Sequence, residues 1–313
     1  MYEQIARNKR RTVACVAAFF VVWVGIGALV GLVWAAASKS PGTASPTNSD
    51  VATGIAVAAA LALIGIAFSL RSGTRMVLAA SGARPADPAQ YLQLHNIVEA
   101  LAIGEGIPKP AVYVIDDPSP NAFATGTSPQ HAAVTATTGL LTMMNREELE
   151  GVIAHELSHI KNYDVRLLLI VSTLIGMAAL LASIMWRSAF FMRRGSRQSG
   201  QLMLIVFAAG ALLAVVAVIF GPIVRFALSR QRESLADVSS VELTRNPEGL
   251  IRALQKLQTN DQPFANFNHA TAAMCIDDPL QHHESWFHHL FDTHPPIAER
   301  IAVLKQIEYG KAA

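Results

Sequence analysis

The sequence predicts an α-helical integral membrane protein with about four transmembrane helices and a mainly helical α+β domain that carries a small sheet. Of the 313 residues, 52% are hydrophobic and only 15% are charged, whereas ordinary soluble domains carry about 25% charged residues. The shortage of charge falls in four apolar runs. The rest of the chain has the mixed polar and apolar texture of a globular domain. The four runs are residues 13–37, 51–70, 167–186 and 202–220.

The first two runs predict a membrane hairpin within residues 1–75, because each is long enough to cross a bilayer, which takes about 20 residues. A signal peptide is the alternative for the first run, since Ala35–Ala37 resembles a cleavage site. A signal's apolar core is typically about 7–15 residues, however, so a retained helix is favoured. Basic residues flank the hairpin and favour a cytoplasmic position for both of its ends. They are Arg7, Lys9, Arg10, Arg11, Arg71 and Arg75.

The third and fourth runs predict a second hairpin within residues 165–224. If both runs cross the bilayer, four arginines between them lie outside, against the positive-inside tendency. A hairpin that enters the membrane without crossing it removes this conflict, but the length of both runs favours crossing. Either version leaves residues 76–164 and 225–313 on one side, where they form the two parts of one domain. The four arginines are Arg187, Arg193, Arg194 and Arg197.

Periodicity and turn residues predict the elements of this domain. Three short strands form a small sheet whose edge could pair with an extended peptide backbone. We expect strands at residues 110–115, 121–126 and 131–138, and helices at residues 85–104, 146–161, 225–243, 247–257 and 297–307.

The most informative stretch is the His-Glu-x-x-His pattern late in the 146–161 helix. On a helix, His155 and His159 are four residues apart, so both imidazoles project from one face and can bind one metal ion. Glu156 lies beside them and can take a proton from a water in the open coordination position. This arrangement is typical of a zinc peptidase. Two histidines on a helix face can also be ordinary surface or core residues, but the apolar flanks of this pair favour a buried metal site.

A third ligand has to come from elsewhere in the chain. A metzincin site is excluded, because Asn162 and Val165 stand where it needs Gly and His. Glu233 and Asp237 share a helical face: Glu233 can complete a His2Glu site, and Asp237 can accept the free N–H of a ligand histidine. The alternative is that both are ordinary solvated helix charges.

Several other features exclude functions or stay without one. The net charge is +2 and the basic residues flank apolar runs, so no nucleic-acid partner is expected. The four runs contain no charged residue, which argues against a transporter. A disulfide between Cys15 and Cys275 is not expected. Clustered histidines, which lack the fixed spacing of a metal site, indicate a mobile loop near the active cleft and have no assigned role. They are His269, His282, His283, His288 and His289.

Five ordered segments resemble the HtpX-like membrane zinc metallopeptidases, relatives of the CAAX prenyl endopeptidases. The resemblance runs nearly the whole chain and includes both hairpins. The segments are NAFATG (121–126), TTGLL (137–141), REELEGVIAHELSHIKNYD (146–164), SRQRESLAD (229–237) and THPPIAERI (293–301).

This resemblance implies a zincin-type domain of the gluzincin class with one Zn²⁺ per chain. His155, His159 and Glu233 would be the zinc ligands and Glu156 the general base. His294 would stabilise the oxyanion or position substrate, and the matching edge strand, at Asn121 and Ala122, would hold the substrate backbone.

The resemblance further implies hydrolysis of protein substrates, membrane proteins among them, at the cytoplasmic face of a bacterial cell membrane, in quality control and stress response. A prenyl-protein endopeptidase shares the same metal chemistry and is the first alternative. A membrane scaffold without catalysis is the second. The sequence does not indicate the oligomeric state.

Overall fold

The computed structural model describes residues 2–37, 48–170, 182–187, 206–207, 210–211, 230–259 and 296–308. Two compact units divide the chain. The first unit includes the described residues 72–169, 230–259 and 296–308, and the second includes residues 10–37 and 48–71. His294, Cys275, the histidine-rich stretch and most of the third and fourth apolar runs lie outside the described residues.

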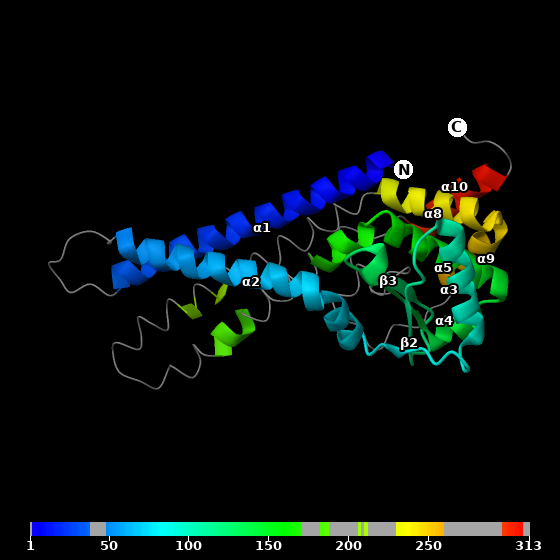
Figure 1. Cartoon of the computed structure of the whole chain (residues 1–313), viewed down its shortest axis with the longest axis horizontal. Coiled ribbons are helices and arrows are strands. Elements are labelled where there is room, and N and C mark those ends of the chain that lie inside the picture. The colour runs from blue at the N-terminus through cyan, green and yellow to red at the C-terminus, as the bar shows by residue number, and fades with distance from the viewer. Residues whose placement is uncertain are drawn as a thin grey trace. The chain divides into compact units, whose positions relative to one another are not determined.

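The predicted first hairpin is present as two long helices, α1 (Tyr2–Ala37) and α2 (Asn48–Ala80), which run side by side (Figure 1). Glycines allow their backbones to approach closely. A Cβ atom added at Gly27 would lie 2.5 Å from the carbonyl oxygen of Gly54, and one added at Gly31 would lie 2.7 Å from that of Asp50. Close packing through small residues is typical of membrane helices, which have no hydrophobic driving force between them in lipid.

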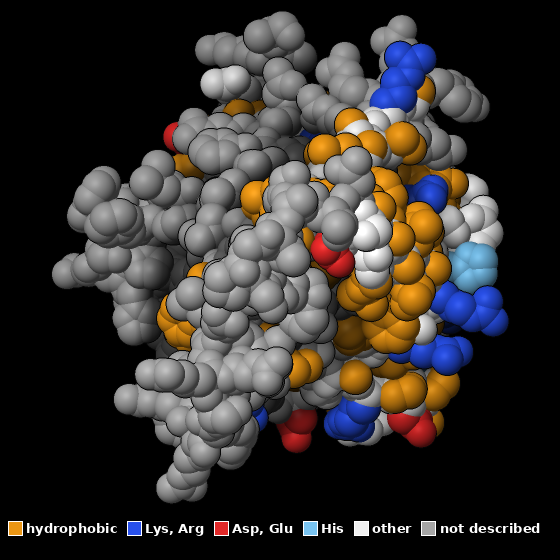
Figure 2. All heavy atoms as spheres, turned by 90° about the vertical axis from the view of Figure 1, so that its left-hand side faces the viewer, with side chains coloured by type: hydrophobic (Ala, Val, Ile, Leu, Met, Phe, Trp, Pro, Cys, Tyr) orange, Lys and Arg blue, Asp and Glu red, His pale blue; other side chains and the backbone are white. Residues whose placement is uncertain are grey.

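The two helices expose many large apolar side chains, and Arg10, Arg71 and Arg75 are exposed toward the ends of the hairpin. Among the described residues, the stretch Ser49–Ala80 is long and apolar enough to cross a membrane, and Val16–Leu32 is a shorter apolar helix. Figure 2 shows that hydrophobic side chains make up much of the described surface on the face drawn there. The exposed large hydrophobic side chains of α1 and α2 are Val13, Val21, Leu29, Leu32, Val57, Leu61, Leu63, Ile64, Phe68 and Leu70.

Short described pieces of the third and fourth runs belong to the same unit. Ile170 and Ala182 join the apolar cluster that Phe19 and Trp23 of α1 form with Ala62 of α2. The rings of Trp186 and Phe207 lie 5.0 Å apart between centroids, so the two runs contact each other. The four-helix arrangement stays a prediction, since most of both runs lies outside the described residues.

The other unit carries the small sheet. The three predicted strands are confirmed as β2 (Ala111–Ile115), β3 (Ala122–Gly126) and β4 (Ala132–Thr137), with a 3-10 turn at Pro129–His131. A two-residue strand that the sequence did not indicate, β1 (Arg84–Pro85), completes the order β1-β2-β4-β3. β2 and β4 are parallel, β3 is antiparallel to β4, and β3 therefore lies at one edge of the described sheet.

The first helix of this unit begins later than predicted. We expected a helix over residues 85–104, whereas α3 spans Leu92–Glu105. The carboxylate of Asp87 accepts hydrogen bonds from the backbone N–H groups of Ala89 and Gln90, at 2.8 and 3.1 Å. Such a side-chain turn competes with helix formation, so the first part of the prediction is wrong.

The central element is α5 (Arg146–Lys161), where the sequence placed it. Its start is fixed by a capping box in which Asn145 and Glu148 each accept the other's backbone N–H. Residues 151–160 are buried without exception, so this part of the helix is enclosed on all sides. Around it and the sheet lie α4 (Thr138–Met143), α8 (Arg230–Thr244), α9 (Pro247–Gln258) and α10 (Ile297–Glu308).

Glycine allows α9 to pack against α5 at backbone distance. A Cβ atom added at Gly151 would lie 2.8 Å from the backbone nitrogen of Leu250, and one added at Gly249 would lie 2.6 Å from the carbonyl oxygen of Glu147. Both contacts are with backbone atoms, which cannot move aside without displacing a helix.

We predict that Gly151→Ala destabilises the protein by about 1–3 kcal/mol, the usual cost of overpacking a core. The loss outweighs the gain of about 1 kcal/mol in helix propensity. Gly104→Ala is the matched control, because its added Cβ would meet the mobile Cδ1 of Leu243 at 2.8 Å. The measurement is the free energy of unfolding in detergent. Equal stability of Gly151→Ala and the parent protein would show that α5 and α9 are not packed at this distance.

Candidate active site

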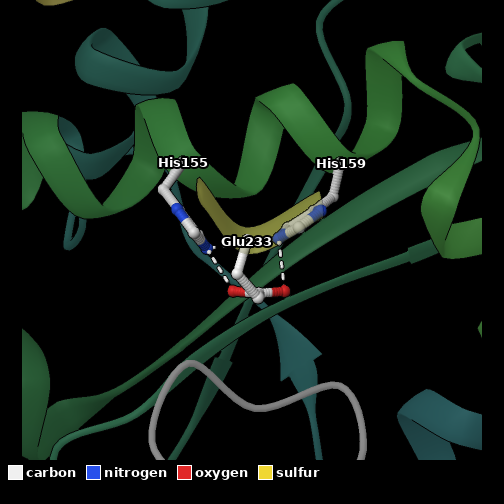
Figure 3. A group of neighbouring side chains, drawn as sticks. All are labelled: His155, His159 and Glu233. Carbon is white, nitrogen blue, oxygen red and sulfur yellow. Dashed lines mark hydrogen bonds and ion pairs between the residues drawn. The ribbon is translucent and has the colours of Figure 1, made fainter. Parts of the chain in front are cut away.

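Both histidines of the motif project from one side of α5 (Figure 3). The rings of His155 and His159 are nearly perpendicular, at 87°, with centroids 4.8 Å apart. Their Nε2 atoms lie 3.2 Å from each other. The four-residue spacing on a regular helix therefore directs both nitrogen lone pairs to one point.

Glu233 of α8 brings its carboxylate to the same point, facing both rings (Figure 3). One oxygen lies 3.4 Å from His155 Nε2 and the other 3.5 Å from His159 Nε2. In a tetrahedral zinc site with bonds of about 2.0–2.1 Å, neighbouring ligand atoms are about 3.3 Å apart. Each oxygen thus lies at about this distance from one nitrogen, and the three donor atoms of the group lie within 4.8 Å of one another, which fits a site for one zinc ion.

Asp237, one turn after Glu233 on α8, contacts the far nitrogen of the first histidine. Its Oδ1 lies 2.9 Å from His155 Nδ1. Arg300 of α10 donates to both oxygens of Asp237, at 2.7 and 3.0 Å. Asp237 thereby fixes the orientation of the His155 imidazole, and the guanidinium group of Arg300 fixes Asp237.

The second histidine has a similar neighbour. Asp164 lies just beyond the end of α5, and its Oδ2 is 3.2 Å from His159 Nδ1. The other oxygen of Asp164 is 3.5 Å from Nη1 of Arg232, the residue before Glu233. Each imidazole is therefore oriented with Nδ1 toward an aspartate and Nε2 toward the shared point.

The charges around this point shift the pKa of both histidines upward. Burial lowers the pKa of His159, but the carboxylates of Glu233, Asp164 and Glu156 outweigh burial and raise it to about 9. Burial and Arg300 lower the pKa of His155, whereas Asp237 and Glu233 raise it further than these lower it. For Asp237, burial raises the pKa, and the charges of Arg300 and His155 bring it below its ordinary value.

Charge balance also fits a divalent cation. Among the described residues around the histidines, four carboxylates and two guanidinium groups are each at most 3% exposed. If both imidazoles are neutral, the four negative and two positive charges give a net charge of −2. A divalent cation, or two protons on the imidazoles, would neutralise it. The six groups are Glu156, Asp164, Glu233, Asp237, Arg232 and Arg300.

Glu156 lies within this buried group, next to His155 in α5, and is 3% exposed. Its negative charge raises the pKa of both His159 and Arg300, which places the carboxylate in the electrostatic surroundings of the candidate metal site. A carboxylate beside a metal site can transfer protons.

The predicted substrate strand lies at the sheet edge, and α5 packs against it. Thr137 N–H donates to the carbonyl oxygen of Asn121 at 2.9 Å. Hydrogen-bonded and non-hydrogen-bonded residues alternate in an antiparallel ladder. The backbone N–H and C=O groups of Phe123 therefore point toward β4, whereas those of Ala122 and Ala124 point away from it. The side-chain oxygen of Asn121 accepts the N–H of Ala122 at 2.8 Å. The amide of Ala124 points toward the same outer edge of β3, a strand whose five residues are all buried.

The structure therefore brings together His155, Glu156, His159, Glu233 and Asp237, which the sequence singled out. His294 lies outside the described residues. Sequence reasoning gave no role to Asp164, Arg232 and Arg300. All three stand in the quoted motifs, but their contacts form only when α5, α8 and α10 meet.

Comparison with known proteins gave consistent matches. Residues 88–308 match the model of Peptidase family M48. The chain is 44% identical to "Protease HtpX homolog" of Streptococcus mutans, over 98% of this chain and all of that protein. It is 43% identical to "Protease HtpX homolog" of Limosilactobacillus fermentum over the same shares. A solved structure of S. mikatae Ste24p is 20% identical with a TM-score of 0.47; the alignment covers 78% of this chain and 56% of that one, so this chain spans about half of its length.

We predict that zinc affinity rises with pH. The pKa of about 9 leaves the imidazole of His159 protonated near neutral pH in the metal-free protein, so zinc must displace this proton. Below the pKa of about 9 for His159, affinity should rise about tenfold per pH unit for each proton displaced. Chelator competition across this range measures the slope, and calorimetry in buffers of different ionisation enthalpy counts the protons.

His95→Gln is the control, since His95 contacts the carbonyl oxygen of Ala86 away from the metal ligands. It should leave the slope unchanged. A zinc affinity that does not depend on pH, with no proton released on binding, would contradict the protonation of His159.

Proposed function

Because this chain belongs to peptidase family M48, we propose that it is a zinc endopeptidase that cleaves damaged or misfolded membrane proteins at the cytoplasmic face of a bacterial membrane. Membership of the family makes it a zinc metallopeptidase. The observation that carries the proposal is the convergence of His155, His159 and Glu233, whose three donor atoms lie within 4.8 Å of one another, next to the buried carboxylate of Glu156.

In this proposal His155, His159 and Glu233 hold the zinc ion. When bound, zinc supplies a Lewis acid that polarises the scissile carbonyl and makes water more acidic. Asp237 fixes His155 in the tautomer that presents Nε2, and Arg300 keeps Asp237 ionised. Three ligands from the chain leave one position open for chemistry, as in catalytic zinc sites.

Glu156 acts as the general base. Its carboxylate takes a proton from the attacking water and then gives this proton to the nitrogen of the leaving amine. Glu156 is 3% exposed, so little bulk water reaches the carboxylate that carries the proton between these two steps. His294, assigned by the resemblance alone, would donate to the oxyanion that forms at the scissile carbonyl.

In this proposal the outer edge of β3, the last strand of the described sheet, binds the substrate main chain. Ala122 and Ala124 present backbone groups to this edge, and Asn121 fixes the amide of Ala122. Addition of an extended strand gives affinity through main-chain hydrogen bonds, which every sequence can make. Such binding suits an enzyme that recognises unfolded segments and not one defined sequence.

The location in a membrane is supported by the apolar surfaces of α1 and α2. An exposed hydrophobic surface of this extent is unfavourable in water and favourable in lipid. The basic residues at the ends of the hairpin favour the cytoplasmic side for the catalytic unit.

We predict that Glu156→Gln keeps zinc and loses hydrolysis, with kcat lower by about 10²–10⁴-fold, because it removes the proton acceptor. His155→Ala should lose both zinc and activity. The measurement is zinc content and cleavage of an unfolded membrane protein by the detergent-purified chain.

Glu150→Gln is the matched control on the same helix, where Glu150 pairs with Arg146 at 2.9 Å. It should keep both properties. Turnover by Glu156→Gln near that of the parent protein would refute the role of general base. A requirement for a lipidated cysteine in the substrate would favour a prenyl-protein endopeptidase instead.

We predict that Ala124→Pro raises KM roughly two- to tenfold, the effect of one lost hydrogen bond of about 0.5–1.5 kcal/mol. Proline is tolerated on an edge strand when the missing N–H faces outward, so zinc content should not change. Ala124→Gly keeps the N–H and should keep the parent KM. Steady-state kinetics with an unfolded peptide substrate checks this, and an unchanged KM in Ala124→Pro would show that the substrate does not pair with this amide.

A further inference from the structure

We propose that Asp164 is a positioning residue for the metal site. It orients the imidazole of His159 and, through Arg232, fixes the part of α8 that presents Glu233. This inference rests on the proposed function, because it takes His159 and Glu233 as zinc ligands.

The first observation is the hydrogen bond itself. Asp164 Oδ2 lies 3.2 Å from His159 Nδ1. An imidazole that donates its Nδ1–H to a carboxylate keeps its lone pair on Nε2. This Nε2 lies 3.2 Å from His155 Nε2 and 3.5 Å from Glu233 Oε1. The contact therefore sets the tautomer that binding of a metal at this point requires.

The second observation is the turn that makes the contact possible. On an uninterrupted α-helix, a residue five positions after His159 would lie about 140° around the axis from it. Instead α5 ends at Lys161, and Tyr163 has a φ of +61°, in the left-handed region. A bulky side chain rarely adopts this conformation. The chain thus turns directly before Asp164 and returns the carboxylate to His159.

The third observation links Asp164 to the other half of the site. Its Oδ1 lies 3.5 Å from Nη1 of Arg232, and both residues are 3% exposed. Arg232 directly precedes Glu233 in α8. The carboxylate of Asp164 thereby contacts both His159 and Arg232, the residue next to Glu233. It fixes the end of α5 and the start of α8 relative to each other, and these are the two segments that a metal ion must bridge.

The arrangement parallels that of the first histidine. Asp237 contacts His155 Nδ1 and is itself paired with Arg300. In both cases a buried aspartate lies between a ligand histidine and a buried guanidinium group. The competing explanation for Asp164 is a purely structural one, because residues 164–170 are helical and an acidic residue at a helix start is stabilising in any protein.

The experiment compares two variants in the full-length, detergent-purified chain. Asp164→Ala removes the acceptor and the charge, whereas Asp164→Asn keeps an acceptor oxygen and removes the charge. We expect Asp164→Ala to bind zinc about 10–100-fold more weakly in chelator competition, as loss of such partners typically does. Asp164→Asn should be intermediate. Both should shift the visible absorption spectrum of the Co²⁺-substituted protein, because the geometry of the His159 ligand changes.

Two controls separate this effect from general damage. Asp117→Asn changes another buried aspartate, 1% exposed, which accepts the N–H of Ser119 in the loop between β2 and β3. It should leave zinc affinity and the Co²⁺ spectrum unchanged. Arg232→Gln should weaken zinc binding in the same direction as Asp164→Asn, since it removes the second contact of the carboxylate.

The outcomes are distinct. A parent protein that binds no zinc would overturn the proposed function and this inference with it. A parent protein that binds zinc, beside an Asp164→Ala that binds it equally tightly, would overturn this inference alone. If Asp164→Ala does not fold, Asp164→Asn decides: a lower melting temperature of the metal-free protein, with unchanged zinc affinity and an unchanged Co²⁺ spectrum, would assign Asp164 a structural role only.

Discussion

The buried charge at the meeting of α5 and α8 is the constraint on which the rest of the catalytic unit depends. Four carboxylates and two guanidinium groups, each at most 3% exposed, surround two imidazoles. Removing an ion from water costs several kcal/mol unless it is paired, so each group needs a partner at a fixed place. The two aspartates find theirs in an imidazole and a guanidinium group. The remaining net charge is −2, and it lies where three donor atoms converge. Two protons or one divalent cation can balance this charge.

This constraint explains why some of the site could be predicted from the sequence and some could not. His155 and His159 share a helix face by their spacing alone, and the same holds for Glu233 and Asp237, because helical period is a local property. Asp164 and Arg300 carry no such signal. Asp164 reaches His159 through a left-handed turn at Tyr163, and Arg300 reaches Asp237 from a helix 63 residues further on. Their roles depend on tertiary contacts.

The fold shows the same division between local and non-local information. The bounds of α5 were predictable because Asn145 and Glu148 form a capping box around a periodic apolar segment. The start of α3 was not, because the turn at Asp87 competes with the helix through side-chain hydrogen bonds. Strand β1 has two residues and forms by pairing with β2, so its own sequence contains no strand pattern to detect.

The metal site also restricts the path of the chain through a membrane. His155 and His159 precede the third apolar run and Glu233 follows the fourth, yet their donor atoms lie within 4.8 Å of one another. A chain that leaves this unit after Leu169 and returns to it before Arg230 ends on the side where it began. If α1 and α2 lie in a bilayer, the segment between the two halves of the site therefore crosses it an even number of times or not at all. A single crossing, or three, would separate the ligands by the thickness of the hydrocarbon core, about 30 Å, and no metal site could form.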